Sequence, residues 1–256
     1  MARLEIELIP ALSDNYIYLL HEPQQGMTAV VDPAEAGPVL EALRRRGSRL
    51  DLALITHHHA DHIGGLLELK ARTGCRAVGP RADAHRIPGL DQLVDEGDRV
   101  VLGALTAAVI ATPGHTSGHI SYWFPEAEAL FCADTLFALG CGRLFEGDAP
   151  TMWRSLQKLA ALPDATRVYC GHEYTLSNAR FALTIDPDNP RLRERAAEVE
   201  AVRARGEPTI PSTIGLEKAT NPFLRAADPA IRRRLGLEQA PDFEVFGEIR
   251  RRKDRA

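Results

Sequence analysis

The pattern of apolar and polar positions divides the chain into two parts of different character. Up to about residue 172, short apolar runs alternate with Gly, Pro and Asp, as in buried strands bounded by turns. Apolar positions also recur with helical spacing at residues 36–46, 63–73 and 152–162. Strands with interleaved helices predict an α/β or α+β domain with stacked layers. The apolar runs predict strands at residues 4–9, 16–20, 28–31, 52–55, 76–78, 99–102, 105–110, 120–124, 129–132 and 167–169.

Beyond residue 174 the pattern becomes that of amphipathic or charged helices. The segments 186–190 and 208–211 contain prolines and predict breaks between these helices. We therefore predict a mixed N-terminal domain over residues 1–173 and a smaller helical domain over residues 174–256. The predicted helices span residues 175–185, 191–205, 229–235 and 242–253.

The composition is that of a globular protein. Apolar residues make up 45% and charged residues 26% of the 256, and a chain of this length can bury a large core. No apolar stretch approaches the roughly 18–20 residues of a membrane helix, and the N-terminal segment lacks the apolar centre of a signal peptide. We expect a cytoplasmic monomer. The cysteines are far apart in the sequence and are expected to be buried thiols; they are Cys75, Cys132, Cys141 and Cys170.

Charge is unevenly distributed along the chain. The net charge of -4 disfavours nucleic acid or a membrane surface as a partner. Residues 191–256 nevertheless carry 15 Lys and Arg against 11 Asp and Glu, whereas residues 1–190 carry 16 against 24. The basic C-terminal segment is either a solvated helix surface or a receptor for an anionic substrate.

Seven of the nine histidines lie in three clusters, each of which follows a predicted strand. The clusters are Thr-His-His-His-Ala-Asp-His at 56–62, Pro-Gly-His-Thr-Ser-Gly-His at 113–119 and Cys-Gly-His-Glu-Tyr at 170–174. Side chains at the ends of neighbouring strands can converge on one point. Because imidazole and carboxylate groups coordinate zinc and similar divalent ions, the clusters predict a metal site.

The first cluster predicts ligands for two ions. Residues two apart in an extended segment face the same way, so His57 and His59 can hold one ion. Asp61 and His62 follow where the predicted helix 63–73 begins, and these two adjacent groups can hardly point to the place where His57 and His59 point. The pattern therefore favours a second ion beside the first.

The other two clusters can supply the remaining ligands. His115 could be the third imidazole of the first ion, and His172 that of the second. Asp134 follows an apolar strand, where a buried carboxylate needs a partner, and bridging both ions would provide one. His58 and His119 fit no ligand position. We expect His58 to point away from the ions and His119 to have a supporting or packing role.

A pair of ions points to hydrolysis. Two divalent ions can share one water and lower its pKa towards neutrality, and one ion can polarise a substrate carbonyl. The candidate catalytic residues are then Asp61 and Asp134, acting with a metal-bridging hydroxide. No motif for a serine or cysteine nucleophile and no general acid stand out in the sequence. A thioester suits such a site, because a thiolate leaves without protonation.

The histidine pattern and several further segments resemble a known family. The Thr-His-x-His-x-Asp-His element with the downstream His115, Asp134 and His172 resembles the metallo-β-lactamase superfamily. Within that superfamily the chain is similar to the glyoxalase II family of hydroxyacylglutathione hydrolases, over almost its whole length. The segments that carry this similarity are residues 13–16, 111–119, 133–137, 140–147, 171–175 and 220–225, with Arg250, Lys253 and Asp254 near the terminus.

The resemblance implies a fold, a cofactor and a reaction. The fold is an αββα four-layer sandwich of the α+β class, followed by a helical C-terminal domain. The reaction is hydrolysis of the thioester of S-(2-hydroxyacyl)glutathione, typically S-D-lactoylglutathione, to glutathione and D-lactate, the second step of methylglyoxal detoxification. The cofactor is a pair of divalent ions, zinc above all, with iron or manganese as alternatives. The first ion would be held by His57, His59 and His115, the second by Asp61, His62 and His172, with Asp134 bridging.

The resemblance also implies which residues bind the glutathione moiety. They are Arg143, Tyr174, Arg250 and Lys253, and Arg and Lys can donate charge-assisted hydrogen bonds to the two carboxylates of glutathione. Phe145 stands where some family members have a tyrosine, so a hydroxyl contact is lost while the ring can still line the pocket. Arg143 replaces a lysine seen in other members, which keeps the charge but changes the geometry.

Three alternatives share part of this pattern. Another hydrolase of the superfamily, such as a lactonase or a different thioesterase, would share the metal centre and differ in the C-terminal half. A mononuclear iron persulfide dioxygenase would leave His62 and His172 without an ion. A non-enzymatic binding module would bind metal without turnover.

Overall fold

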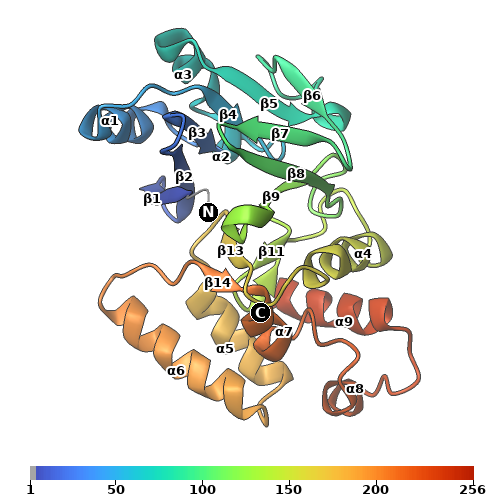
Figure 1. Cartoon of the computed structure of the whole chain (residues 1–256). Helices are drawn as coiled ribbons and strands as arrows, with labels where there is room; N and C mark the ends of the chain where they lie inside the picture. Colours follow the sequence, from blue (N-terminus) through green and yellow to red (C-terminus); the bar gives the residue numbers. More distant parts are fainter. Residues whose placement is uncertain (1–3) are drawn as a thin grey trace. The chain divides into compact units, whose positions relative to one another are not determined.

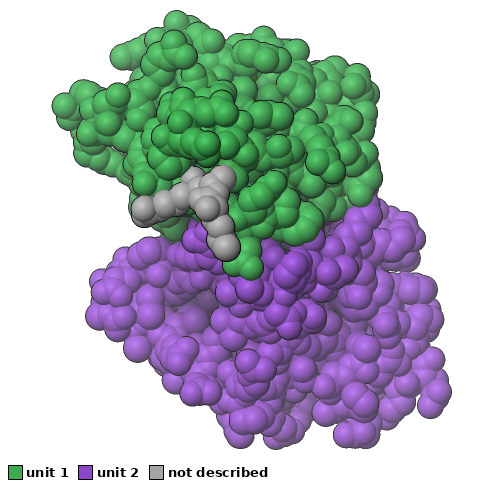
Figure 2. Space-filling model, in the orientation of Figure 1, with its two compact units in different colours: residues 1–111, 116–133 green, residues 112–115, 134–256 purple. Residues whose placement is uncertain are grey.

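The computed structural model describes residues 4–256 and divides into two compact units. Unit 1 comprises residues 1–111 and 116–133, and unit 2 comprises residues 112–115 and 134–256 (Figure 2). This division lies near residue 134, whereas the change from strand-rich to helical sequence lies near residue 173. Each unit carries part of the predicted set of metal ligands.

Unit 1 contains two groups of paired strands. In the first group the order is β1-β2-β3-β4-β5-β6; the pairs up to β3 are antiparallel, and those from β3 to β6 are parallel. In the second group, β7, β8, β9 and β10 pair antiparallel in sequence order. The strands are β1 (Glu5–Ala11), β2 (Asn15–Glu22), β3 (Met27–Val31), β4 (Leu52–Leu54), β5 (Arg76–Pro80), β6 (Gln92–Val94), β7 (Arg99–Leu102), β8 (Leu105–Ala111), β9 (Ile120–Phe124) and β10 (Ala129–Ala133).

Helices α1 (Ala36–Arg46) and α3 (Leu66–Thr73) pack against the first group of strands, and the second group lies on its other side (Figure 1). The strands are apolar because both groups are buried on their facing sides. Between the two groups, the hydroxyl of the fully buried Tyr122 lies 2.9 Å from the carbonyl oxygen of Ile55. Unit 1 is therefore layered as helices, sheet and sheet, in agreement with the stacked layers that the strand and helix pattern predicts.

The parallel strands place polar side chains at one edge of the first sheet. Asp32 directly follows β3, His57 follows β4, and Asp83 follows β5 at the end of a short 3-10 turn. The carboxyl ends of neighbouring parallel strands lie at the same edge, which is where ligand sites form in such sheets. The first histidine cluster therefore begins between two strand ends that each carry a carboxylate.

The predicted helix over residues 63–73 is wrong in its first part. The structure has a single helical turn, α2 (Ala60–Ile63), and a break of two glycines before α3. A Cβ on Gly64 would lie 2.5 Å from the carbonyl oxygen of Ala34, and Gly65 has equally close backbone neighbours. The backbone that follows β3 thus packs so tightly here that only glycine fits, and the helix is interrupted.

Unit 2 is mainly helical, and the predicted helices of the C-terminal part are confirmed, two at the same bounds and two to within one residue. The sequence pattern does not predict the short elements of the two units, which have two to seven residues; they are β6, β11, β12, β14, α2, α7 and two 3-10 turns at residues 81–83 and 125–127. Among residues 4–256, no helix combines the length and apolar character needed to cross a membrane. The elements of unit 2 are β11 (Leu136–Phe137), β12 (Gly140–Cys141), α4 (Ala149–Ala160), β13 (Arg167–Cys170), α5 (Thr175–Ile185), α6 (Pro190–Ala204), β14 (Ser212–Thr213), α7 (Ile214–Thr220), α8 (Pro229–Leu235) and α9 (Asp242–Asp254).

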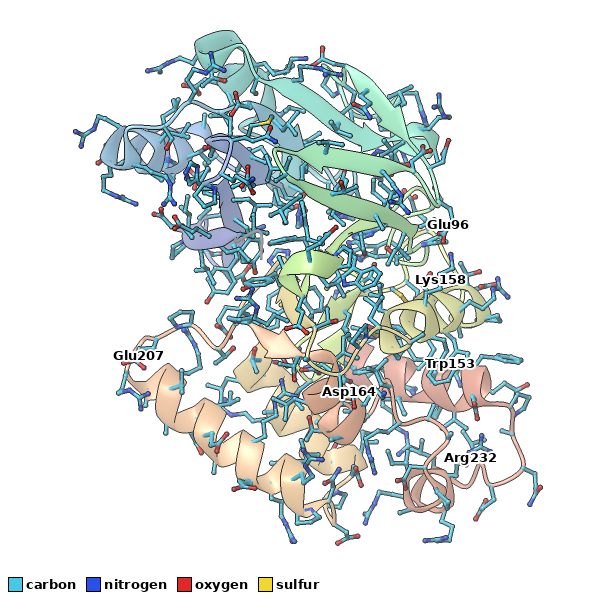
Figure 3. All side chains as sticks on the ribbon, in the orientation of Figure 1. Glu96, Trp153, Lys158, Asp164, Glu207 and Arg232 are labelled. Carbon is cyan, nitrogen blue, oxygen red and sulfur yellow. The ribbon has the colours of Figure 1, made fainter. Side chains whose placement is uncertain are left out.

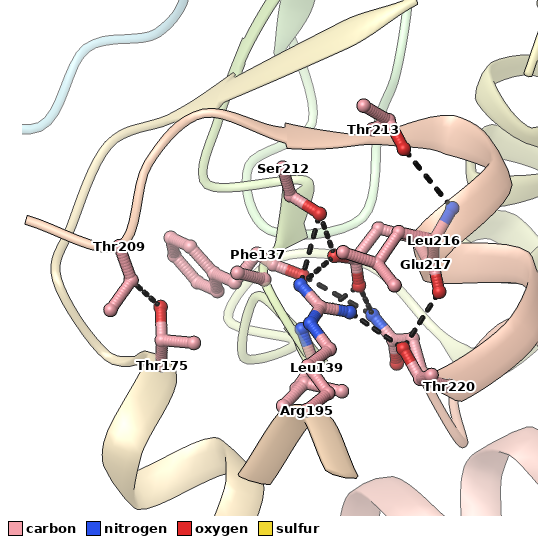
Figure 4. A network of polar contacts seen from close by, with 12 residues as sticks. Phe137, Leu139, Thr175, Arg195, Thr209, Ser212, Thr213, Leu216, Glu217 and Thr220 are labelled. Atoms are coloured by element: carbon pink, nitrogen blue, oxygen red, sulfur yellow. Dashed lines mark hydrogen bonds and ion pairs between the residues drawn. The ribbon is translucent and has the colours of Figure 1, made fainter. Parts of the chain in front are cut away.

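A buried polar network connects helices α6 and α7 to the β11–β12 hairpin (Figure 4). Arg195 on α6 and Glu217 on α7 form a buried ion pair with an N–O distance of 2.5 Å. The other carboxylate oxygen of Glu217 accepts from the backbone nitrogen of Leu139 (2.9 Å) and from the amide of Asn221 (2.9 Å). Asn221 also donates to the carbonyl oxygen of Gly140 (2.9 Å). The network thereby fixes the hairpin from which one predicted substrate-binding loop begins.

Arg232 on α8, labelled in Figure 3, stabilises the segment that links α8 to α9. Its guanidinium donates to the carbonyl oxygens of Ala226 (3.1 Å) and Ala240 (2.8 Å) and forms an ion pair with Asp242. Charge-assisted hydrogen bonds of this kind are stronger than neutral ones. They hold the start of α9, the helix that carries two of the predicted substrate-binding residues.

Candidate metal centre

Asp32 belongs to no sequence motif, yet its carboxylate contacts several residues of the first ligand cluster. Its buried carboxylate accepts from the backbone nitrogen (2.8 Å) and the hydroxyl (2.7 Å) of Thr56, and it lies 3.1 Å from Nδ1 of His62. The Thr56 hydroxyl lies 2.9 Å from Nδ1 of His57. Since Nδ1 of both histidines has a protein partner, Nε2 is the atom suited to bind a metal. Asp32 lies within ligand distance of both rings, but its bonds to Thr56 and His62 indicate an orienting role.

The predicted ligands of the first cluster form two close pairs. Nε2 of His57 lies 3.2 Å from Nδ1 of His59, and Nε2 of His62 lies 3.5 Å from the carboxylate of Asp61. The amide of Asn15 donates to that carboxylate (3.0 Å) and to the carbonyl oxygen of the same residue (3.1 Å). These are the pairs that the sequence predicts to share one ion each.

In unit 2, Asp134 lies between two histidines. One of its carboxylate oxygens lies 3.3 Å from Nε2 of His115 and 3.4 Å from Nε2 of His172. Nδ1 of His115 donates to the carbonyl oxygen of Arg143 (3.0 Å), which orients the ring. A Cβ on Gly142 would lie 1.9 Å from the carbonyl oxygen of Asp134, so only glycine lets this loop approach so closely.

The distances between these donor atoms test whether they suit a metal ion. Two ligands of a tetrahedral zinc ion, each about 2.1 Å from it, are about 3.4 Å apart. The pairs His57–His59, His115–Asp134 and His172–Asp134 have separations of 3.2, 3.3 and 3.4 Å. Each residue of these pairs except His59 is buried. The chemistry and spacing of the donors in both units therefore fit divalent ions.

The two histidines for which no ligand position is predicted support the ligand-bearing segment. The buried ring of His119 stacks on that of His57, with centroids 4.8 Å apart and an interplanar angle of 24°. His58 turns instead towards Asp83, with 3.1 Å between Nδ1 and the carboxylate. Both rings therefore contact protein groups that position the first cluster.

Three of the predicted substrate-binding residues form a cationic group in unit 2. The buried Arg250 donates to the carbonyl oxygen of Cys141 (2.8 Å) and pairs with Asp254 (2.9 Å). Lys253 is half-buried; its burial, and then the nearby charges of Arg250 and Arg143, lower the pKa of its ammonium group. Because like charges at this proximity repel each other, the group favours an anionic ligand.

Aromatic rings adjoin the predicted ligands of unit 2. Tyr174 stacks on His172, with centroids 4.8 Å apart and an interplanar angle of 3°, and it meets the edge of Phe137 at 5.3 Å. The ring of Phe145 lies 5.2 Å from that of His115 and is 62% exposed. Tyr174 and Phe145 thus present apolar surface beside two predicted metal ligands.

Two buried cysteines of unit 2, Cys141 and Cys170, do not offer a nucleophile. Burial raises the pKa of the Cys141 thiol to about 11 and that of the Cys170 thiol to about 12. Both are therefore protonated at neutral pH and weak as nucleophiles. All four cysteines are free and buried, which confirms the prediction from the sequence.

Replacing Asp32→Asn should weaken metal binding about 10–100-fold, because the hydrogen-bonding partner that orients His57 and His62 is disturbed. Asparagine keeps the shape of the side chain and tolerates the positive φ of 47° at this position. The measurement is the zinc dissociation constant, by competition with a chromophoric chelator. Unchanged affinity would show that Asp32 does not orient the ligands.

Comparison with known proteins identifies the superfamily and the family to which the chain belongs. A model of the metallo-β-lactamase superfamily matches residues 13–172, and a model described as the hydroxyacylglutathione hydrolase C-terminus matches residues 173–256. A hydroxyacylglutathione hydrolase from Methylococcus capsulatus is 62% identical over 251 residues, 98% of each chain. One from Rhizobium etli is 58% identical over 254 residues, 99% of each chain. The chain belongs to the hydroxyacylglutathione hydrolase, or glyoxalase II, family of the metallo-β-lactamase superfamily.

Solved structures give the same fold. The crystal structure of ETHE1 from Myxococcus xanthus has a TM-score of 0.70 and 26% identity, with 96% of this chain and 90% of that chain covered. The BLEG-1 B3 metallo-β-lactamase has a TM-score of 0.67 and 24% identity, with 86% and 99% covered. The predicted α+β metallo-β-lactamase fold with a helical C-terminal part is confirmed. The family also implies a dinuclear site for divalent ions.

Proposed function

We propose that this chain hydrolyses the thioester of S-(2-hydroxyacyl)glutathione, typically S-D-lactoylglutathione, to glutathione and D-lactate, the second step of methylglyoxal detoxification. The observation that carries the proposal is the combination of His/Asp donor sets with the cationic group of Arg143, Arg250 and Lys253. Relatives named hydroxyacylglutathione hydrolase, 56–62% identical over nearly the whole chain, support it.

The proposed cofactor is a pair of zinc ions. When bound, such a pair supplies an activated water and a Lewis acid for the thioester carbonyl. Imidazole and carboxylate donors suit zinc, and the same donors bind iron or manganese. The proposed first site consists of His57, His59 and His115, the second of Asp61, His62 and His172, and Asp134 belongs to both.

The protein's own groups then have separate tasks. Asp32 orients the imidazoles of the first cluster, and Asp134 holds the imidazoles on either side of it. Arg143 and Lys253 bind the carboxylates of the glutathione moiety, whose two negative charges match them. Arg250 holds the backbone before Arg143 through the carbonyl of Cys141 and adds positive charge. The rings of Tyr174 and Phe145 would cover the thioester and keep bulk water from it.

Replacing Lys253→Ala should raise KM about 10–100-fold and leave kcat within about twofold. A hydrogen bond to a charged group contributes about 1.5–3 kcal/mol, and this one would be equally strong in the ground and transition states. The measurement is steady-state hydrolysis of S-D-lactoylglutathione. The matched control is Arg252→Ala, which removes a cation on the same helix that pairs with Glu248. A fall in kcat at constant KM would contradict the binding role.

A panel of substrates separates the proposed function from its alternatives. Metal-loaded protein should cleave S-D-lactoylglutathione at least about a hundredfold more efficiently than a simple lactone or an acyl-coenzyme A thioester. Each tenfold preference corresponds to about 1.4 kcal/mol of transition-state binding. Preferential cleavage of a lactone would assign a different hydrolase activity. Oxygen consumption with glutathione persulfide would instead assign a dioxygenase.

We further propose that residues 1–173 form the catalytic domain and that residues 174–256 form a helical domain that contributes to glutathione binding. Support comes from the two family models, which meet between residues 172 and 173. We also propose that the protein acts in the cytoplasm as a monomer. Size-exclusion chromatography with light scattering should give a mass near 28.1 kDa.

A further inference from the structure

His58 lies between two proposed ligands of the same ion, and its side chain has a buried partner of its own. In an extended segment successive side chains point to opposite sides, so a ring between His57 and His59 must point away from the ion that they share. Nδ1 of His58 lies 3.1 Å from a carboxylate oxygen of Asp83. The exposed fractions of the two side chains are 16% and 0%.

Asp83 is in turn fixed from two further sides. Its other carboxylate oxygen forms an ion pair with Arg86, and that guanidinium also donates to the hydroxyl of Ser117 (3.1 Å). A Cβ on Gly118 would lie 2.3 Å from the carboxylate of Asp83, so the backbone of that glycine presses against it. A buried carboxylate held by a cation, a histidine and a close backbone has little freedom to move.

This arrangement joins the segment 56–59 to the segment 116–120 of unit 1. The same two segments are also joined by the hydrogen bond from the backbone nitrogen of Ile120 to the carbonyl oxygen of Thr56 (3.0 Å) and by the stacked rings of His57 and His119. The side chain of His58 points away from those of His57 and His59 and adds a further link through Asp83, which restrains the rotation of the segment.

We propose that Asp83 is a positioning residue that acts through His58. It holds the backbone between His57 and His59 so that both imidazoles face one divalent ion, and no part of this task requires contact with the substrate. This proposal rests on the assignment of His57 and His59 as metal ligands. Groups that orient metal ligands from outside typically change metal affinity about 10–100-fold when they are removed.

The test compares His58→Leu with His58→Asn. Leucine removes the hydrogen bond to Asp83, whereas the side-chain amide of asparagine can place a donor near the position of Nδ1. The zinc dissociation constant, measured by chelator competition, should rise about 10–100-fold for His58→Leu and stay within about threefold of the parent for His58→Asn. His85→Leu is the matched control, because it makes the same change at an exposed position in the segment that follows Asp83.

Asp83→Asn should weaken zinc binding to the same extent, and kcat should recover when zinc is in excess. If this variant fails to fold because Arg86 is left without its anion, the His58 variants still decide the question. Equal zinc affinities for His58→Leu and the parent would overturn the proposal. A His57→Ala variant that still bound zinc as tightly as the parent would instead overturn the ligand assignment on which it rests.

Discussion

Replacing Asp134→Ala should lower kcat/KM at least about a thousandfold and reduce the metal content of the protein. The carboxylate lies within 3.4 Å of Nε2 of both His115 and His172, so its removal takes one donor from each proposed ion. Loss of about 4 kcal/mol of charge stabilisation in the transition state corresponds to a thousandfold in rate. The measurement combines metal analysis of the purified variant with hydrolysis of S-D-lactoylglutathione.

The control for this variant is Asp188→Ala, which removes an exposed carboxylate that pairs with Arg234 at the surface of the same unit. Its activity and metal content should match those of the parent protein. Full activity and two ions per chain in the Asp134 variant would contradict the bridging assignment. A folded Asp134 variant with two ions and no activity would assign Asp134 to the chemical step instead of metal binding.

Replacing Glu217→Ala should lower the free energy of unfolding by about 3–5 kcal/mol. The substitution leaves the buried guanidinium of Arg195 without its anion, and breaking a buried pair from one side has an effect of this size. It also removes the acceptor of the backbone nitrogen of Leu139 and of the amide of Asn221. Urea unfolding followed by circular dichroism measures the change.

Glu207→Ala is the matched control, because it removes the same side chain from an ion pair in which both partners are 54% exposed. Exposed pairs of this kind contribute about 0–1 kcal/mol, so the control should unfold close to the parent. If Glu217→Ala were no less stable than Glu207→Ala, the buried network would have no structural role. A lower activity of the Glu217 variant at low temperature would further indicate that the network positions the hairpin before Arg143.

Much of the fold can be predicted from the sequence because its longer strands and helices bury regular apolar patterns. The strands around residues 16–20 and 120–124 are wholly or largely buried, and the apolar runs in the sequence indicate this burial directly. The seven-residue helix α7, in contrast, is not predicted. It contains Gly215, and a Cβ at this position would lie 3.0 Å from the side chain of Asp164, so the reason for the glycine is a contact that the local sequence does not show. The break before α3 likewise depends on a distant backbone segment that no local pattern reveals.

In the candidate site, too, some residues can be predicted from local sequence motifs, whereas others depend on contacts between residues that are distant in the sequence. The histidine clusters stand out because metal ligands recur at short spacing after strands. Asp32 is a single residue after β3, and its role depends on Thr56 and His62, which are distant in the sequence. The partner of His58 is equally hidden, since Asp83 follows a different strand. Local motifs thus predict the donors, whereas the groups that orient them depend on how the parallel strands are placed.

The most direct test of the central claim is hydrolysis of S-D-lactoylglutathione by the purified protein before metal removal, after it, and after reloading with zinc. The account predicts efficient turnover, a loss of at least about a hundredfold when the metal is stripped, and recovery on reloading. Turnover that survives complete metal removal would contradict the metal-based mechanism. Absence of turnover by protein that holds two ions per chain would contradict the proposed substrate.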